Sequence, residues 1–261
     1  MRHSPLSFLV FLLSLLLALP AQAAKNAVSE ALLTVPGESE GAEETPPEFR
    51  EAVSAYQNKE YARALLLWRD LAVEDYGPAL YNLGVAYEHG RGVRPDPAAA
   101  AGWYARAAEQ DIAEAYNNLG RLFAHGLGVA QDHKKAFGFF QAAAEMDDAP
   151  AQFNLAVAYL QGQGVGIDAE NAALWFEAAA EQGHVLAQYN LAGLYQTGRG
   201  VDQDMDKAVY WFDEASQAGD SLATYSLAML YYRGVGIDKD LQGARRHLQA
   251  AAEAGVLAAQ H

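Results

Sequence analysis

Four aspartates have the spacing of ligands in a calcium-binding loop: Asp202, Asp204 and Asp206 alternate along the chain, and Asp213 stands at the twelfth position. Calcium is held by carboxylate and carbonyl oxygens, and a glycine at the sixth position makes the sharp turn of the loop. This sequence has Lys207 at that position. The departure favours a structural role for these aspartates over a calcium site.

Three closely spaced glycines, Gly162, Gly164 and Gly166, come closest to a phosphate-binding loop. Such a loop follows a β-strand and ends in Gly-Lys-Ser or Gly-Lys-Thr, because the lysine and the hydroxyl contact the phosphates and magnesium. Here the preceding residues have the spacing of a helix, and Gly-Lys-Ser/Thr does not occur. We interpret these glycines as turn residues.

Two histidines, His89 and His125, lie 36 residues apart at equivalent places in the sequence. Packed helices lie about 8 to 10 Å apart, whereas two imidazoles that share a zinc ion need bonds of about 2 Å. We therefore expect surface histidines here and no metal site.

The sequence has no other residues that mark a known catalytic site. It contains no cysteine, which excludes disulfides, thiolate zinc sites and cysteine nucleophiles, and it lacks Ser-x-x-Lys, Gly-x-Ser-x-Gly and His-Glu-x-x-His. The formal net charge is -15, from 33 Asp and Glu against 18 Lys and Arg, and such a surface repels phosphate. We predict no catalytic, cofactor-binding or metal-binding residues and no nucleic-acid partner.

The elements that would position any binding site repeat with a period of 36 residues. Recurring positions hold alanine, leucine, an aromatic residue, a glycine pair and an aspartate. In the first copy these residues are Ala79, Leu83, Tyr87, Gly90, Gly92 and Asp96. So many positions in register predict five copies, residues 79–114, 115–150, 151–186, 187–222 and 223–258.

Each copy has the spacing of two helices joined by a turn. Apolar residues recur every three or four positions on both sides of Gly90, which is expected to end the first helix, and Asp96 is expected to cap the second. One hairpin buries too little apolar surface to offset the entropy of ordering its backbone, so the hairpins must stack. We predict an all-α fold, a right-handed α-solenoid of stacked helical hairpins.

The N-terminal residues have the three parts of a secretory signal peptide. Arg2 precedes an apolar run from Phe8 to Leu19, and a small-residue site ends at Ala23. An uncleaved anchor is the alternative, but a membrane span needs about 20 apolar residues and Pro20 interrupts this run. Residues 1–23 thus predict export, to the periplasm or as a secreted protein, with no membrane anchor after cleavage.

The rest of the chain outside the five copies divides into three short parts. Residues 24–48 are polar and acidic and are expected to be a flexible linker. Residues 49–78 form a shorter hairpin without the Gly-x-Gly loop, which we expect to cap the N-terminal end of the stack, and residues 259–261 form a tail. At the other end, His247 replaces the tryptophan of Trp103, so we expect the last helix to face solvent.

The repeated pattern Ala79-x-Tyr81-Asn82-Leu83-Gly84, followed by Gly90, Gly92, Asp96, Ala100 and Trp103, resembles the Sel-one-like repeat family, relatives of tetratricopeptide repeats with a longer loop between the helices. The resemblance covers residues 79–258, and residues 49–78 are similar to an ordinary tetratricopeptide unit. It implies an α-solenoid adaptor that binds other proteins, without implying one partner. Together with the export signal, we expect a monomer in the bacterial cell envelope that binds a protein or peptide. Some exported relatives are rich in cysteine and have been linked to β-lactam hydrolysis, so an envelope hydrolase of β-lactam or peptidoglycan-like substrates is the alternative, although this chain departs from them in having no cysteine.

The candidate partner-binding residues lie on the first helix of each copy. In tetratricopeptide-like stacks this helix lines the concave face, so we expect a partner to bind there. Position 81 is about 200° around the helix from Leu83 and so points away from that core contact. The candidates are Tyr81, Asn117, Arg121, Phe153, Tyr189 and Tyr225. Rings would supply contact area, Asn117 would hold a peptide backbone, and Arg121 would pair with a carboxylate. The alternative is that the rings pack between neighbouring first helices.

Overall fold

The computed structural model describes residues 45–256, and this part of the chain consists of helices and loops without β-strands. The predicted signal peptide, most of the predicted linker and the tail lie outside the described residues. The chain divides into two compact units, Met1–Gln110 and Asp111–His261. No helix within residues 45–256 has the length and apolar content that a membrane span requires.

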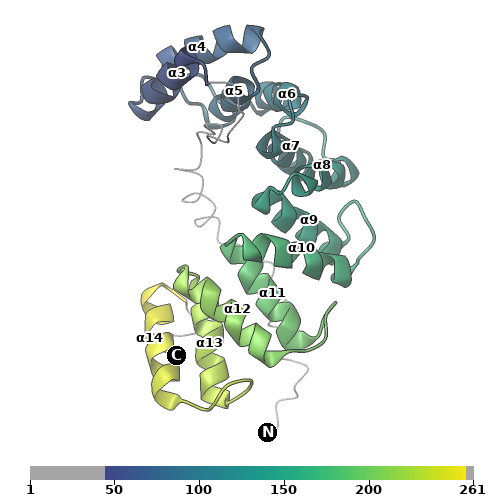
Figure 1. The fold of residues 1–261 in the computed structure, drawn as a ribbon, viewed down its shortest axis with the longest axis vertical. Helices are drawn as coiled ribbons and strands as arrows, with labels where there is room; N and C mark the ends of the chain where they lie inside the picture. The colour runs from purple at the N-terminus through teal and green to yellow at the C-terminus, as the bar shows by residue number, and fades with distance from the viewer. Residues whose placement is uncertain (1–44, 257–261) are drawn as a thin grey trace. The chain divides into compact units, whose positions relative to one another are not determined.

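The helices come in pairs that pack as antiparallel hairpins (Figure 1). Unit 1 contains α3 (Pro47–Gln57), α4 (Tyr61–Val73), α5 (Gly77–His89) and α6 (Pro97–Ala108). Unit 2 contains α7 (Ala113–His125), α8 (His133–Glu145), α9 (Ala149–Gln161), α10 (Ala169–Glu181), α11 (Val185–Thr197), α12 (Met205–Gln217), α13 (Ser221–Arg233) and α14 (Leu241–Glu253). Within each unit the second helix of one hairpin packs against the first helix of the next, which is the stacking that the 36-residue period predicted.

The helix boundaries follow from the repeated glycine and aspartate. Gly90 and its four equivalents adopt the left-handed conformation that ends each first helix, as predicted. Asp96 and its four equivalents precede the second helices, and their carboxylates accept hydrogen bonds from backbone N–H groups of the first turn. Asp204 is one of these caps, so the cap interpretation of this residue is confirmed.

The hydrophobic core runs along the contact between first and second helices. Leu83 and its equivalents in the other four repeats are almost completely buried, as are the alanines four residues before them. On the second helices the buried aromatic residues are Tyr104, Phe140, Phe176 and Phe212, while the preceding residues, such as Trp103, are half-buried. The core of each hairpin therefore lies one residue further along the second helix than Trp103.

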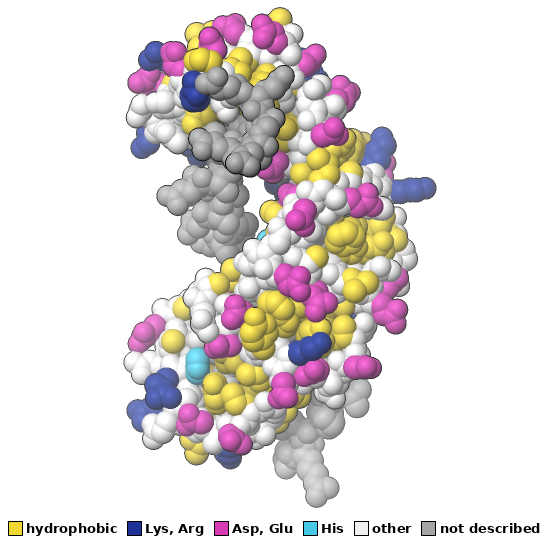
Figure 2. All heavy atoms as spheres, viewed as in Figure 1, with side chains coloured by type: hydrophobic (Ala, Val, Ile, Leu, Met, Phe, Trp, Pro, Cys, Tyr) yellow, Lys and Arg dark blue, Asp and Glu magenta, His cyan; other side chains and the backbone are white. Residues whose placement is uncertain are grey.

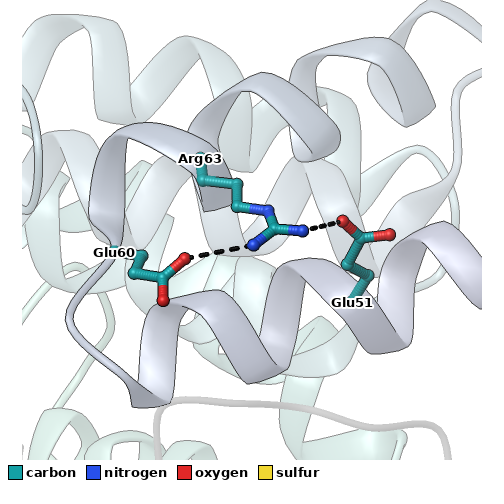
Figure 3. Close-up of polar contacts among 3 residues, drawn as sticks. All are labelled: Glu51, Glu60 and Arg63. Carbon is teal, nitrogen blue, oxygen red and sulfur yellow. Dashed lines mark hydrogen bonds and ion pairs between the residues drawn. The ribbon is translucent and has the colours of Figure 1, made fainter.

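The first hairpin, α3 and α4, has a short connection and lacks the Gly-x-Gly loop, as the sequence predicted. The guanidinium of Arg63 on α4 bridges two carboxylates (Figure 3): it lies 2.7 Å from Glu51 on α3 and 3.3 Å from Glu60. All three side chains are exposed, so the pairs contribute little to the free energy of unfolding. Burial of Phe49 and Trp68 supplies the main stabilisation.

Within each unit, the second glycine of the pair allows the loop to approach the preceding hairpin. A Cβ atom on Gly200 would overlap the backbone carbonyl oxygen of Ala169, at the start of α10, and a Cβ on Gly164 would overlap that of His133, at the start of α8. Both glycines also have a positive φ, 75° and 78°. The recurring Gly-x-Gly therefore both ends a helix and sets how closely neighbouring hairpins of the same unit pack.

The C-terminal repeat keeps a ring contact at the position where histidine replaces tryptophan. His247 on α14 stacks on Tyr231 of α13, with ring centroids 5.5 Å apart and planes inclined by 9°. In unit 1 the equivalent pair is Tyr87 and Trp103, at 6.4 Å. His247 is half-buried, so this side chain packs within its own hairpin, while Arg245 and Arg246 beside it are exposed.

Candidate partner-binding surface

The six predicted binding residues all lie on first helices. Five of them occupy the same position of α5, α7, α9, α11 and α13, and Arg121 lies one turn further along α7. Tyr81 belongs to unit 1 and the other five residues belong to unit 2. The alanine and leucine positions that fix the core side of each first helix also fix the direction of these side chains.

The rings at this position pack against the second helix of the same repeat. Tyr81 lies 5.8 Å from Tyr104, and Tyr189 lies 5.6 Å from Phe212, measured between ring centroids. Phe153 makes the equivalent contact with Phe176, at 5.7 Å. Tyr81 is 6% exposed, whereas Phe153 and Tyr189 are half-buried and keep part of their surface accessible.

Tyr225 on α13 differs from the other rings in its surroundings. The position that holds Tyr104, Phe140, Phe176 and Phe212 in earlier repeats holds Leu248 in the last one. Tyr225 is half-buried, and no ring contact of this residue is found within the described part of the chain. The other three aromatic candidates each pack against an aromatic ring of the second helix, whereas, within residues 45–256, Tyr225 does not.

The two polar candidates lie together on α7. Asn117 is 9% exposed, and its Oδ1 accepts a hydrogen bond from Nδ2 of Asn154 on α9, at 2.8 Å. This bond joins the first helices of two neighbouring repeats. Arg121 is half-buried, one helical turn after Asn117. The structure thus brings Asn117, Arg121 and Phe153 onto the adjacent helices α7 and α9.

Burial affects the ionisation of Tyr189 at the centre of this surface. The pKa of its phenol is raised, chiefly because burial disfavours the anion, and the negative charge of Asp220 adds to the effect. A hydrogen bond with Ser226 acts in the opposite direction. Tyr189 is therefore a neutral hydrogen-bonding ring at physiological pH.

Sequence reasoning missed a row of N-terminal caps on the first helices of unit 2. Asp148, His184 and Asp220 occupy equivalent positions, and each accepts a hydrogen bond from the backbone N–H three residues later. Their 36-residue spacing was visible in the sequence, but Tyr76 and Ile112 occupy the same position in the first two repeats and interrupt the pattern. Burial raises the pKa of Asp148 to about 6, raises that of Asp220 and lowers that of His184.

A buried amide network connects two further repeats. Gln152 is 3% exposed, and its Nε2 donates to Oδ1 of Asp147 at 2.9 Å. The side-chain amide of Gln182 donates to the same carboxylate at 3.0 Å and to Oε1 of Gln152 at 2.9 Å. These bonds satisfy polar groups between α8, α9 and the end of α10, so the network stabilises the stack.

The ionisable groups of unit 2 whose pKa values are shifted by burial include three helix caps. Within residues 45–256, no group of three or more histidine, aspartate or glutamate side chains is placed to hold a metal ion. The perturbed groups Asp148, His184 and Asp220 are engaged as helix caps.

Comparison with known families and structures identifies the repeat. The family model described as "Sel1 repeat" matches residues 77–112, 113–148, 149–184, 185–220 and 221–256, so each matched copy begins two residues before the boundaries expected above. No curated protein gives a significant match to the chain.

Two solved structures are similar over most of the chain. A protective antigen of uropathogenic Escherichia coli, which displays an SLR fold, is 33% identical with a TM-score of 0.79, and the match covers 82% of this chain and 46% of that protein. This chain thus spans about half the length of the antigen. A Sel1 repeat protein from Oxalobacter formigenes is 27% identical with a TM-score of 0.76, covering 82% of this chain and 86% of that one.

A more distant structure shares only the fold. An immunity protein from Pseudomonas aeruginosa is 17% identical with a TM-score of 0.52, and the match covers 81% of this chain and 83% of that protein. The stacked helical hairpins thus recur at low sequence identity, where the shared feature is the repeat architecture.

Proposed function

Since the chain belongs to the Sel1 repeat family, we propose that it is a non-catalytic scaffold that binds a protein or peptide through the face formed by its first helices. Members of this family are generally protein-interaction scaffolds. The observation that carries the proposal is the row of half-buried rings at one position of α9, α11 and α13, with polar groups of α7 beside it.

The first-helix face of unit 2 combines features that suit an extended peptide. Phe153, Tyr189 and Tyr225 offer apolar area on side chains that lose little entropy on binding, because each ring has only two rotatable bonds. Arg121 lies on the same face and would pair with a carboxylate of the peptide. The repeat spacing would place such groups at regular intervals along a bound chain.

Export to the cell envelope is part of the proposal and rests on residues 1–23. In that location the scaffold would be free of its leader, would have no membrane anchor and would act as a monomer. N-terminal sequencing of the native protein should find Ala24, or a residue next to it, as the first residue. Recovery of Met1 would show that the leader is retained.

Substitutions of two half-buried residues test the binding face. Tyr225→Ala and Arg121→Ala should reduce capture of the partner from envelope extracts while leaving the thermal unfolding midpoint almost unchanged. A lower thermal unfolding midpoint with unchanged capture per folded molecule would instead show that these side chains serve packing within the protein. Purified protein should not turn over nitrocefin; turnover would support the hydrolase alternative.

A further inference from the structure

Two second helices of unit 2 carry the same arrangement of an exposed apolar side chain between two carboxylates. Residues four before and three after a given residue lie on the same side of a helix, so each set forms one surface. The two sets are Glu170, Leu174 and Glu177 on α10, and Asp206, Tyr210 and Asp213 on α12. The sets occupy equivalent positions of neighbouring repeats, and together they are called the acidic–apolar face below.

The apolar residues of the acidic–apolar face are largely exposed to solvent. Leu174 is 62% exposed and Tyr210 is 54% exposed. The ring of Tyr210 meets the ring of Trp211 edge to face at 4.9 Å, and both Trp211 and Trp175 pack on the hydrophobic core below. The exposed side chains are therefore next to tryptophans that the core holds in place. A partner that covered Leu174 and Tyr210 would remove their apolar area from water.

The other second helices show that stacking does not require this arrangement. The equivalent residues are Ala62, Leu66 and Arg69 on α4, Ala98, Gly102 and Ala105 on α6, Lys134, Gly138 and Gln141 on α8, and Gln242, Arg246 and Gln249 on α14. A Cβ on Gly102 or Gly138 would meet no atom within 4 Å, so packing leaves the middle position unconstrained. The combination of two acids and an apolar residue is specific to α10 and α12.

None of the four carboxylates of this face forms an ion pair within residues 45–256. The ion pairs within the described residues involve Arg63, Arg106 and Arg246, which lie on other helices. Lys207 of α12 lies nearby, over the ring of Tyr195 at 4.8 Å from the centroid. A hydrogen bond to the Tyr195 hydroxyl and, to a smaller extent, the charges of Asp204 and Glu177 raise the pKa of Lys207. Glu177 itself accepts a hydrogen bond from the Tyr195 hydroxyl at 3.3 Å, and this one lysine stands against four carboxylates. The face therefore keeps a net negative charge around its apolar residues.

We propose that the acidic–apolar face is a second docking surface, separate from the first-helix face, and that it binds a cationic amphipathic segment of a partner protein. Lysine or arginine side chains of such a segment would pair with the four carboxylates, and its apolar side chains would cover Leu174 and Tyr210. Figure 2 shows hydrophobic side chains with Asp and Glu among them over the helices labelled α9 to α12 in Figure 1. The chain's own residues 24–44 are acidic and do not complement this charge.

Peptide binding measured by fluorescence anisotropy tests the proposal. The probe is a labelled helical peptide of about 18 residues, which gives about five turns, with leucines on one side and lysines on the other. The double variant Leu174→Ala/Tyr210→Ala, which keeps the charge, should bind this probe at least tenfold more weakly than the wild type. The double variant Glu170→Gln/Asp206→Asn keeps the apolar residues. It should bind the probe at least tenfold more weakly than the wild type, and its affinity should depend less on salt concentration.

A charge-matched control separates a specific face from general attraction to an acidic protein. Glu48→Gln/Glu114→Gln removes two acids from the first turns of α3 and α7 and should change the affinity by less than twofold. Equal weakening in this control, or unchanged binding in Leu174→Ala/Tyr210→Ala, would overturn the proposal. So would wild-type dimerisation in sedimentation velocity that this double variant abolishes, because a second copy would then be the occupant.

Discussion

The imidazole of His184 stacks on the ring of Phe153, with ring centroids 4.7 Å apart, while its Nδ1 accepts a hydrogen bond from the backbone N–H of Ala187 at 3.2 Å. One histidine thus caps α11 and also covers a candidate binding residue on α9. Only the neutral imidazole has a free acceptor nitrogen, and burial lowers the pKa of His184 below its ordinary value of 6.5.

Acidification should therefore destabilise the repeat that His184 caps. Because its pKa is lower in the folded state, the unfolded state binds the proton first, and this contribution to stability is lost as pH falls below about 6.5. His184→Asn keeps a capping oxygen without a titratable group, so on going from pH 7 to pH 5 its free energy of unfolding should fall less, or rise more, than that of the wild type. His125→Asn, at an exposed residue of α7, serves as the control and should follow the wild type. Parallel urea titrations at the two pH values provide the measurement.

Asp148 should show the opposite pH dependence. Its pKa is about 6 in the folded protein, above the ordinary 3.8, because burial disfavours the carboxylate and the charge of Glu114 adds to this, although the hydrogen bond from Ala151 opposes it. The folded state thus holds a proton between about pH 4 and pH 6 that the unfolded state has released, so stability falls as pH rises through this window. Asp148→Asn should stabilise the protein by about 1 to 3 kcal/mol at pH 7 and by much less at pH 4.

Asp168 is another capping aspartate, and its substitution by asparagine should change the stability in the opposite direction. Hydrogen bonds from the backbone N–H and the side chain of Asn171 lower the pKa of Asp168. Its carboxylate therefore stabilises the folded state at pH values above the ordinary pKa of 3.8. Asp168→Asn should therefore destabilise the protein at pH 7. If both substitutions shifted stability in the same direction at pH 7, burial would not explain the behaviour of Asp148.

The close approach of Gly200 to α10 predicts a strong effect from one methyl group. Gly200→Ala would drive a Cβ into the carbonyl oxygen of Ala169 at a positive φ of 75°, so we expect a loss of at least about 2 kcal/mol. Gly193→Ala is the matched control, because this glycine lies inside α11 with open space around it, and it should gain about 0.5 to 1 kcal/mol. Chemical unfolding curves that show equal midpoints for the two variants would contradict this packing.

Tyr189 and Tyr225 should differ in their contribution to stability although they occupy equivalent positions. Tyr189 packs on Phe212, whereas Tyr225 has Leu248 at the corresponding place in its repeat. We expect Tyr189→Ala to lower the free energy of unfolding by about 1 to 3 kcal/mol and Tyr225→Ala by less than about 1 kcal/mol. Thermal melts of the two single variants measure the difference, and a larger loss in Tyr225→Ala would disprove the ring-packing explanation.

The sequence was sufficient to predict the helical hairpins because the residues that define them recur in every copy. Leu83 marks the core side of the first helix, Gly90 its end and Asp96 the start of the second helix, and each has a local physical role that needs no knowledge of the neighbours. The contribution of Gly200 to spacing between repeats was not predictable, because it depends on how closely a loop approaches Ala169.

The environment of the candidate binding residues was harder to predict for a related reason. The side chain at position 81 points about 200° away from that of Leu83 and so away from the contact that Leu83 makes. A helix in a stack has neighbours on more than one side, however, so this side chain can still be buried against another helix. Tyr81 turns out to be 6% exposed against Tyr104, while Tyr225 keeps more accessible surface. Binding by these residues stays a prediction, and the half-buried members of the row are the ones to test.

Site-specific photo-crosslinking in the native cell envelope tests the scaffold proposal most directly. Benzoylphenylalanine would replace Tyr225 or Met229, which lie one turn apart on the first-helix face of α13, and as a control Gln141, which is exposed on α8. We expect both α13 positions to crosslink the same protein, identified by mass spectrometry, and Gln141 not to crosslink it. Equal crosslinking from Gln141, or no crosslinking from either position on α13, would contradict binding through the first helices.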